Sequence, residues 1–276
     1  MTKATATIII PAHNEAGYIA ECLAHVLAQD AGGLQVIVAA NACTDDTVAI
    51  ARALEADFAA RGYALAVLDL PKPGKISALN SAETQAGAGP RIYLDADVRC
   101  DPTLVGQLEA ALDTDAPRYA TGRLVVSRAQ TALTRAYARL WQELPFVKAG
   151  AVGAGLFAVN AAGRARWGAF PDIISDDTFV RLNFTPAERI EVHACYHWPM
   201  IEGFAGLVKV RRRQDAGVRQ VRRLYPDLMV NDTTPGLGLA GAARLALRHP
   251  VSFAVYLAVH LAVRTKRSSD EWTRGR

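Results

Sequence analysis

Cysteine is scarce in this sequence, with only four residues in 276, at positions 22, 43, 100 and 195. None belongs to a Cys-x-x-Cys pair, so the spacing argues against a zinc knuckle and against a disulfide framework. Disulfides persist mainly in oxidising compartments, whereas this pattern favours a reducing one. We therefore expect a cytoplasmic protein.

The sequence also lacks a long hydrophobic run and a strong net charge. Its longest apolar stretch, residues 250–263, is too short for a bilayer span, which needs about 20 residues. The first apolar stretch does not resemble a secretory leader, so we expect none. The net charge of +4 is too small to indicate a nucleic-acid partner, and we expect none, although basic residues gather in the last third of the chain.

Internal repeats and low-complexity linkers are absent, and the first hundred residues instead alternate short apolar segments with amphipathic ones. β-Branched runs predict strands at 5–12, 34–42, 63–71 and 90–97. Helical spacing predicts helices at 14–29, with Asn14 as its N-cap, at 43–62 and at 75–87. This alternation is typical of an α/β protein with a mostly parallel sheet.

Polar loops follow all four of these strands. They read PAHNE (11–15), ANACTDD (40–46), LPKPGK (70–75) and DADVRCD (95–101). Ligands of open parallel sheets bind beyond the carboxyl ends of the strands. We therefore expect the four loops to converge on one binding edge.

The last of these loops carries two carboxylates, Asp95 and Asp97. In an extended strand both side chains point to the same face, and two like charges so close need a positive partner. A divalent cation such as Mn²⁺ or Mg²⁺ is one such partner, because it takes one or two carboxylates and bridges to phosphates. A solvated loop, a haloacid-dehalogenase-like phosphatase and a nucleotidyltransferase are the alternatives. The phosphatase motif belongs to a first strand, and no Gly-rich nucleotidyltransferase loop follows the first strand here.

Order and spacing over residues 5–101 resemble those of the family 2 glycosyltransferases. The family's Pro-x-x-Asn-Glu element is similar to residues 11–15, and its Gly-Lys-x-x-Ala-Leu-Asn segment is similar to residues 74–80. LDAD at 94–97 is similar to the family's metal-binding strand end. The resemblance implies the A-type glycosyltransferase fold, a mostly parallel central sheet with flanking helices, followed here by a helical C-terminal extension.

The resemblance also implies an inverting transfer from a nucleoside-diphosphate sugar, with UDP as the first choice, to a carbohydrate or lipid-linked hydroxyl acceptor in polysaccharide or glycolipid synthesis. A non-catalytic sugar-nucleotide-binding protein of the same fold is the alternative from another class. The residues that the resemblance places against the nucleotide sugar are Pro11, His13, Glu15, Asn41, Asp45, Lys75, Asp95, Ala96, Asp97 and Gly155.

Catalytic and metal-binding roles follow from the same resemblance. Asp177, in the acidic segment SDDTF, is the expected general base, with Asp176 as the second choice; N-capping of a helix is the other reading of this pair. Mn²⁺ or Mg²⁺ is expected at Asp97 and Asp95, with His197 as a further ligand. Arg211–Arg213 are expected either to clamp a diphosphate or anionic lipid or to lie on a solvated helix.

The expected domain organisation is a catalytic domain at 1–232, divided into a nucleotide-sugar half at 1–101 and an acceptor half at 102–232. An apolar and basic helical extension follows at 233–276. Apolar bulk between Arg and Lys residues suggests that 237–267 touches the inner face of the cell membrane; packing on the core or on a second subunit are the alternatives.

Overall fold

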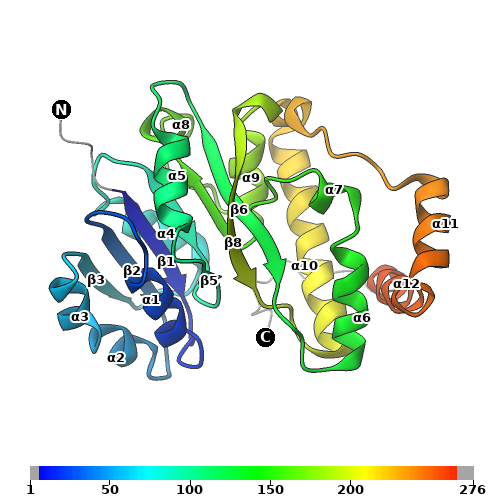
Figure 1. Cartoon of the computed structure of the whole chain (residues 1–276), viewed down its shortest axis with the longest axis horizontal. Coiled ribbons are helices and arrows are strands. Elements are labelled where there is room, and N and C mark those ends of the chain that lie inside the picture. Colours follow the sequence, from blue (N-terminus) through cyan, green and yellow to red (C-terminus); the bar gives the residue numbers. More distant parts are fainter. Residues whose placement is uncertain (1–5, 266–276) are drawn as a thin grey trace. The chain divides into compact units, whose positions relative to one another are not determined.

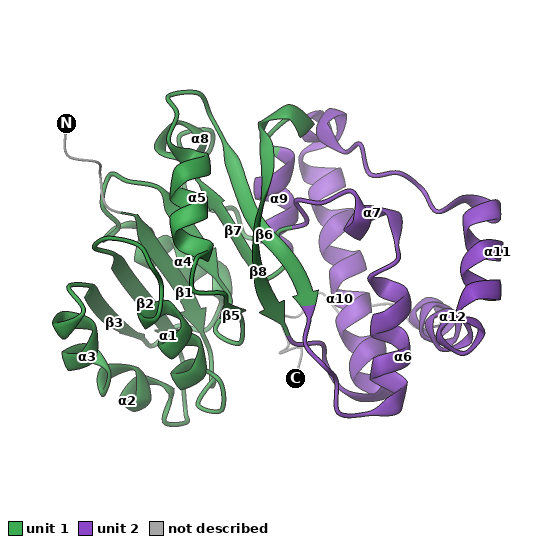
Figure 2. Ribbon diagram, in the orientation of Figure 1, with its two compact units in different colours: residues 1–125, 153–172, 183–198 green, residues 126–152, 173–182, 199–276 purple. Residues whose placement is uncertain are grey.

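The computed structural model describes residues 6–265 (Figure 1). Lys266 and Arg267, at the end of the expected membrane-contact segment, lie outside the described residues. Within 6–265, no helix is both long and apolar enough to cross a bilayer. Chain packing divides the protein into unit 1, residues 1–125, 153–172 and 183–198, and unit 2, residues 126–152, 173–182 and 199–276 (Figure 2). Neither residue 101 nor residue 232 is a boundary of these units, so the functional domain limits stay a prediction.

Unit 1 is built on an eight-stranded sheet with the order β3-β2-β1-β4-β7-β6-β8-β5. β1, β2, β3 and β4 are parallel to one another, whereas β7 is antiparallel to β4 and β6, and β5 is antiparallel to β8. The sheet is therefore mixed. The strands are β1 (Thr7–Ala12), β2 (Gln35–Asn41), β3 (Ala64–Leu70), β4 (Arg91–Leu94), β5 (Arg99–Cys100), β6 (Tyr119–Val126), β7 (Leu156–Val159) and β8 (Arg189–Trp198).

Burial on both faces explains why the first strands read as continuous apolar runs rather than alternating ones. Every residue of β1 is buried, and Ile8 lies between Val36 of β2 and Ile92 of β4. Ile8, Val36 and Ile92 belong to one hydrophobic cluster with residues of α1 and α5. α4 contacts β1 and β2 from the other face of the sheet (Figure 1). The helices of unit 1 are α1 (Ile19–Leu27), α2 (Thr47–Arg52), α3 (Glu55–Ala60), α4 (Lys75–Glu83), α5 (Leu104–Leu112), α8 (Ala161–Arg164) and the 3₁₀ helix η1 (Pro186–Glu188).

Unit 2 is helical. Its helices are α6 (Ala132–Trp141), α7 (Pro145–Lys148), α9 (Asp176–Leu182), α10 (Gly203–Leu224), the 3₁₀ helix η2 (Pro226–Asn231), α11 (Gly238–Arg248) and α12 (Pro250–Arg264). α12 packs against both α6 and α10. The Tyr137 and Tyr256 rings stack at 5.3 Å, and burial in this packing raises the pKa of Tyr137 to about 12.

Two sequence-based boundaries are wrong. The segment 43–62 forms two short helices, α2 and α3, because the chain turns at residues 53–54. α1 begins at Ile19 rather than after Asn14, whose φ of 51° is left-handed and whose side chain bonds elsewhere. α11 and α12, by contrast, confirm the expected helical extension as far as residue 264, and residues 266–276 of that extension lie outside the described residues.

Candidate nucleotide-sugar site

The four polar loops follow parallel strands of unit 1, as expected from the sequence. β1, β2, β3 and β4 run in one direction, so the loops after them lie along one edge of the sheet. Hydrogen bonds connect these loops to one another.

Asn41, the last residue of β2, joins two of its neighbours. Its Nδ2 donates to Ala12 O at 2.7 Å, and its Oδ1 accepts from Gly74 N at 3.0 Å. The side chain is 1% exposed, so both ends of the amide serve the backbone. Asn41 thus holds the end of β1 and the turn before Lys75 in register. These contacts position the two neighbouring loops, and the nucleotide contact expected of Asn41 stays a prediction.

The loops after β1 and β2 form a second set of contacts. Asn14 Oδ1 accepts from Thr44 N at 2.6 Å, and Asp45 Oδ2 accepts from Ala16 N at 3.1 Å. His13 Nδ1 lies 2.7 Å from Asn41 O. Asparagine tolerates the left-handed conformation that Asn14 adopts. The loop geometry therefore depends on Asn14, which bridges two loops and does not cap α1.

Asp95, Ala96 and Asp97 lie in a turn that follows β4. Val98 N donates to Asp95 O at 3.1 Å and closes a four-residue β-turn. The expectation that both carboxylates share one face of a strand is therefore wrong, because the strand ends at Leu94. Beneath the turn, the Cys22 Sγ lies 3.8 Å from Asp95 O, and burial raises the pKa of that thiol.

Lys75 is the positive partner of this turn in the structure. It begins α4 directly after Gly74, whose φ is 132°, and its Nζ lies 3.0 Å from Asp95 Oδ1. Both side chains are partly exposed, so ligands can reach the pair. An ammonium and a carboxylate side by side can bind a phosphate and a cation, respectively.

Gly155, which the resemblance places against the nucleotide sugar, lies against the same turn. Its carbonyl accepts from Asp95 N at 2.9 Å. Its φ is 78°, and a Cβ at this position would lie 2.7 Å from Trp198 Cδ1. Only glycine fits here without a shift of the indole or the turn.

The chemistry of the turn suits a hard divalent cation. Asp95 and Asp97 supply carboxylate oxygens, the ligands that Mg²⁺ and Mn²⁺ prefer, and Asp95 already holds a cation in the form of Lys75. His197, on β8, contacts another acid: its Nε2 lies 3.3 Å from Asp101 Oδ1. No group of three His, Cys, Asp or Glu side chains suited to a metal occurs within residues 6–265.

The acidic pair expected in catalysis lies in unit 2, in the first turn of α9. Asp176 is buried, and Asp177 Oδ1 accepts from Thr178 N at 2.6 Å. α10 holds the preceding turn, because Gln220 Oε1 accepts from Ile174 N at 2.9 Å. The pair therefore stands on a rigid helix start, where carboxylates are favoured.

Comparison with known proteins identifies the family. The sequence model described as glycosyl transferase family 2 matches residues 7–166, more than half of the chain. The chain belongs to glycosyltransferase family 2. No curated protein matches the sequence.

Solved structures share the fold of this glycosyltransferase. The mannosyltransferase PcManGT from Pyrobaculum calidifontis, in complex with GDP-Man and Mn²⁺, matches with a TM-score of 0.60 and 21% identity over 98% of this chain and 77% of that one. S. aureus TarS 1-349, in complex with UDP-GlcNAc, matches with a TM-score of 0.56 and 15% identity over 94% and 81%. The expected A-type fold is confirmed.

Asp101 is a residue of the glycosyltransferase that no sequence motif singled out. Its Oδ2 accepts from Cys195 N at 3.1 Å, and its Oδ1 faces His197. It thereby ties the chain after β5 to β8. β5 has only two residues, and its partner β8 lies about a hundred residues later in the chain. No local sequence pattern therefore predicts this contact.

Two residues of the basic segment Arg211–Arg213 form contacts within unit 2. Arg211 Nε lies 2.9 Å from Asp215 Oδ1, and Arg212 Nη2 donates to Ala262 O at 2.5 Å. Arg212 also donates to Val263 O at 3.3 Å, so it satisfies carbonyls at the end of α12. Arg212 thus connects α10 to α12, whereas the ion pair of Arg211 lies within α10. The expected alternatives for this segment, an anion clamp and a solvated helix, stay predictions.

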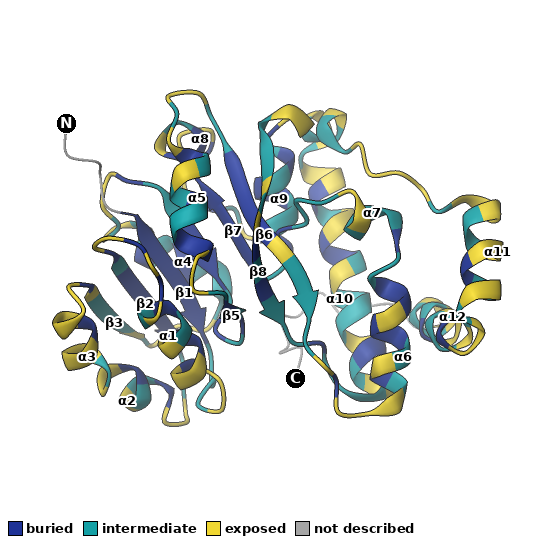
Figure 3. Ribbon diagram, in the orientation of Figure 1, coloured by how far each residue is buried: buried dark blue, intermediate teal, exposed yellow. Residues whose placement is uncertain are grey.

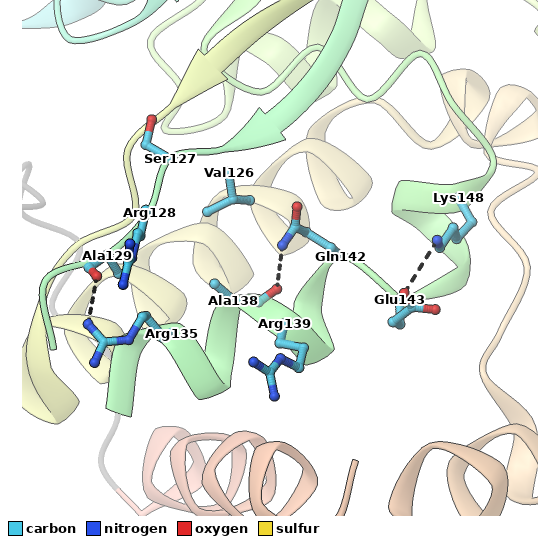
Figure 4. Close-up of a pocket in the computed structure, with 10 residues that line it drawn as sticks. All are labelled: Val126, Ser127, Arg128, Ala129, Arg135, Ala138, Arg139, Gln142, Glu143 and Lys148. Atoms are coloured by element: carbon cyan, nitrogen blue, oxygen red, sulfur yellow. Dashed lines mark hydrogen bonds and ion pairs between the residues drawn. The ribbon is translucent and has the colours of Figure 1, made fainter. Parts of the chain in front are cut away.

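A cavity of about 370 Å³ lies in unit 2, between the end of β6 and the helices α6 and α7 (Figure 4). Arg135 donates to Ala129 O at 3.0 Å, and Lys148 Nζ lies 3.5 Å from Glu143 Oε1. Two of its basic side chains are therefore already engaged in local contacts. Its lining residues are Val126, Ser127, Arg128, Ala129, Arg135, Ala138, Arg139, Gln142, Glu143 and Lys148.

Proposed function

We propose that this protein is an inverting glycosyltransferase that moves a sugar from a nucleoside-diphosphate sugar, UDP-linked as the first choice, to a hydroxyl group of a carbohydrate or lipid-linked acceptor. The observation that carries the proposal is the pairing of Lys75 with Asp95 beside Asp97, at the edge where four loops meet. This edge offers a cation for phosphate and carboxylates for a metal. The biological setting, polysaccharide or glycolipid synthesis, stays a prediction.

Donor binding is assigned to the loops of unit 1. Pro11, His13, Glu15 and Asp45 are proposed to line the base and ribose, and Lys75 is proposed to contact the diphosphate as a point charge. Ala96 and Gly155 keep the turn small enough for the donor to approach its backbone. Asn41 supports these residues from beneath.

The metal site is assigned to Asp97 and Asp95, with His197 kept as a proposed additional ligand. A bound Mn²⁺ or Mg²⁺ would neutralise negative charge on the departing nucleoside diphosphate. The role of the protein is to present two carboxylates on a rigid turn. Asp97 is proposed to be the direct ligand and Asp95 to face the ribose.

Asp177 is the proposed general base. It would take the proton of the acceptor hydroxyl while that oxygen bonds to the anomeric carbon and the bond from that carbon to the diphosphate oxygen breaks. Attack from the face opposite the leaving group inverts the anomeric configuration. Asp176, which is buried, is proposed to orient the substrate or the helix start.

A thermal-shift panel of nucleoside diphosphates and nucleotide sugars, with and without Mn²⁺, tests donor binding. The expected result is stabilisation by at least one nucleoside diphosphate that increases with the metal. The GDP-Man of the mannosyltransferase and the UDP-GlcNAc of TarS make those two nucleotides the first to test. If none stabilises the protein in either condition, the proposal fails.

A non-catalytic sugar-nucleotide-binding protein would give the same thermal shifts. The difference lies in turnover: the enzyme releases the nucleoside diphosphate when an acceptor is supplied, and Asp177→Asn abolishes that release. The acids at positions 176 and 177 favour the enzyme, since a binding protein does not need them.

A further inference from the structure

α11 and α12 of unit 2 expose an unusual amount of apolar surface. Leu239 is 92% exposed, Leu247 87% and Val251 70%. Figure 3 shows exposed segments along α11. Scattered exposed apolar residues are common, but a contiguous set of large ones marks an interaction site. Because α11 and α12 contact each other, the three side chains belong to neighbouring helices.

The exposed residues follow helical spacing. On α11, Leu239 and Leu247 are eight residues apart and face the same side, with exposed Ala243 between them. Each helix also has a buried side, which includes Leu245 on α11 and Val259 on α12. The buried residues of α11 and α12, and not the exposed apolar ones, therefore pack against the rest of unit 2. The exposed apolar stripe of α12 consists of Val251, Ala254, Leu257, Ala258 and Leu261.

The charge of this segment has a single sign. The sequence has no Asp or Glu between Asp232 and Asp270, whereas Arg244, Arg248 and Arg264 fall within it. Arg244 and Arg248 are both exposed, next to the leucine stripe of α11. Arg248 Nη1 also lies 3.9 Å from Glu143 Oε2, while Arg244 extends the exposed basic row.

We infer that the exposed face of α11 and α12 docks on the surface of a membrane that contains anionic phospholipid. Apolar side chains beside a row of arginines match the acyl boundary and the charged headgroups of such a surface. A second copy of the chain fits less well, because it would bring identical rows of arginines together. α12 has 15 residues, about 22 Å of helix at 1.5 Å per residue, so it would lie in the interface and not span it.

This inference is independent of the proposed glycosyl transfer, because it concerns binding to lipid and not turnover. Burial of one leucine contributes roughly tenfold to a partition coefficient, and each arginine near an anionic surface contributes somewhat less. Loss of both leucines should therefore reduce membrane binding strongly, and loss of one arginine should reduce it only on anionic vesicles.

Co-sedimentation of the full-length protein with vesicles tests the inference. One vesicle is phosphatidylcholine alone, and the other contains about 30% phosphatidylglycerol as the anionic lipid. The expected result is stronger binding to the anionic vesicles, weakened by salt. Leu239→Ser with Leu247→Ser should lower the partition coefficient at least about tenfold. Arg244→Gln should remove part of the difference between the two vesicles.

The matched control is Val230→Ser in η2, which removes a side chain that is 80% exposed but lies outside α11 and α12. It should bind vesicles like the unchanged protein. All variants alter exposed side chains, so unfolding midpoints should stay the same and exclude misfolding as the cause. The inference is overturned if the unchanged protein does not bind anionic vesicles, or if the double variant binds as well as Val230→Ser. It is also overturned if the double variant instead dissociates a dimer seen without lipid.

Discussion

Lys75 Nζ lies 3.0 Å from Asp95 Oδ1, so the first residue of α4 neutralises one of the two carboxylates that follow β4. Residues 75 and 95 come together because the strands before them, β3 and β4, end at the same edge of the sheet. In the proposed site, Lys75 would contact phosphate and the carboxylates would hold the cation. The energy of the ion pair in the folded protein is small, since both side chains are partly exposed and such pairs contribute about 0–1 kcal/mol.

Replacement of Lys75 should therefore change ligand binding far more than stability. Lys75→Ala should weaken nucleoside-diphosphate binding about tenfold to a hundredfold, the value of one charge-assisted hydrogen bond. The free energy of unfolding should fall by at most about 1 kcal/mol. Titration calorimetry and urea unfolding measure the two effects, and Lys72→Ala, at an exposed position in the same loop, is the control. Equal affinities in both variants would remove Lys75 from the site.

Asn41→Ala should lose stability and nucleotide affinity together. The substitution leaves Ala12 O and Gly74 N without their present partner, which costs about 2 kcal/mol or more in the buried site. It also releases the turn that positions Lys75. Asn160→Ala is the matched control, because Asn160 is also a buried asparagine whose amide serves the backbone, after β7. Asn160→Ala should lose stability alone; loss of affinity in both variants would contradict a positioning role for Asn41.

Gly155→Ala should destabilise unit 1. The new Cβ meets Trp198 Cδ1 at 2.7 Å, and a φ of 78° is strained for alanine, so we expect a loss of about 1–3 kcal/mol. Gly168→Ala is the control, because open space surrounds a Cβ there. Chemical unfolding of both variants measures the difference, and similar free energies would contradict the close packing around the turn.

Glu188 should give the fold a defined acid sensitivity. Its hydrogen bond with Arg166 lowers the pKa of the carboxyl group from its ordinary value of 4.5 to about 2. Because the folded pKa is depressed, this stabilisation is complete above about pH 4.5 and is lost as the pH falls toward 2.

Unfolding of Glu188→Gln at several pH values checks this dependence. The variant should be less stable than the unchanged protein at pH 7, and the difference should shrink below the ordinary pKa of 4.5. Glu55→Gln, at an exposed position of α3, is the control and should show no such convergence. A difference that stays constant with pH would mean that the ion pair does not act as described.

Asp177→Asn should separate binding from chemistry. The amide keeps the shape of the side chain but cannot accept the acceptor's proton, so turnover should fall about a hundredfold to ten-thousandfold. Affinity for the nucleotide sugar should stay unchanged. Asp176→Asn is the comparison that decides between the two acids: if it alone abolishes turnover without changing stability, Asp176 and not Asp177 is the base.

The sequence predicted the strands of unit 1 well because burial on both faces makes β1 and β2 continuous apolar runs. The sequence also predicted that Lys75 begins a helix. Gly74, directly before it, has a positive φ, which glycine adopts readily. Position along the chain, together with the motifs, identified the edge and the family.

Contacts between residues far apart in the chain could not be predicted from the sequence. Nothing local distinguishes an asparagine that caps a helix from Asn14, which bridges two loops 30 residues apart. Similarly, the local sequence of Arg211–Arg213 is typical of a solvated basic helix. In the structure, Arg212 donates to the carbonyl of Ala262 in α12, which is 50 residues later in the chain. The turn at Asp95 is set by Gly155, which β7 brings beside it. Such contacts depend on packing that the local pattern does not encode.

The central claim, that the edge at Lys75, Asp95 and Asp97 binds a nucleoside diphosphate together with a divalent cation, is tested most directly by the metal dependence of UDP and GDP affinity. Calorimetric titrations in Mn²⁺ and in EDTA should give at least about tenfold tighter binding with the metal for the preferred nucleotide. Asp97→Asn should remove that difference. Equal affinity of the unchanged protein in Mn²⁺ and EDTA, or an undiminished metal effect in Asp97→Asn, would contradict the claim.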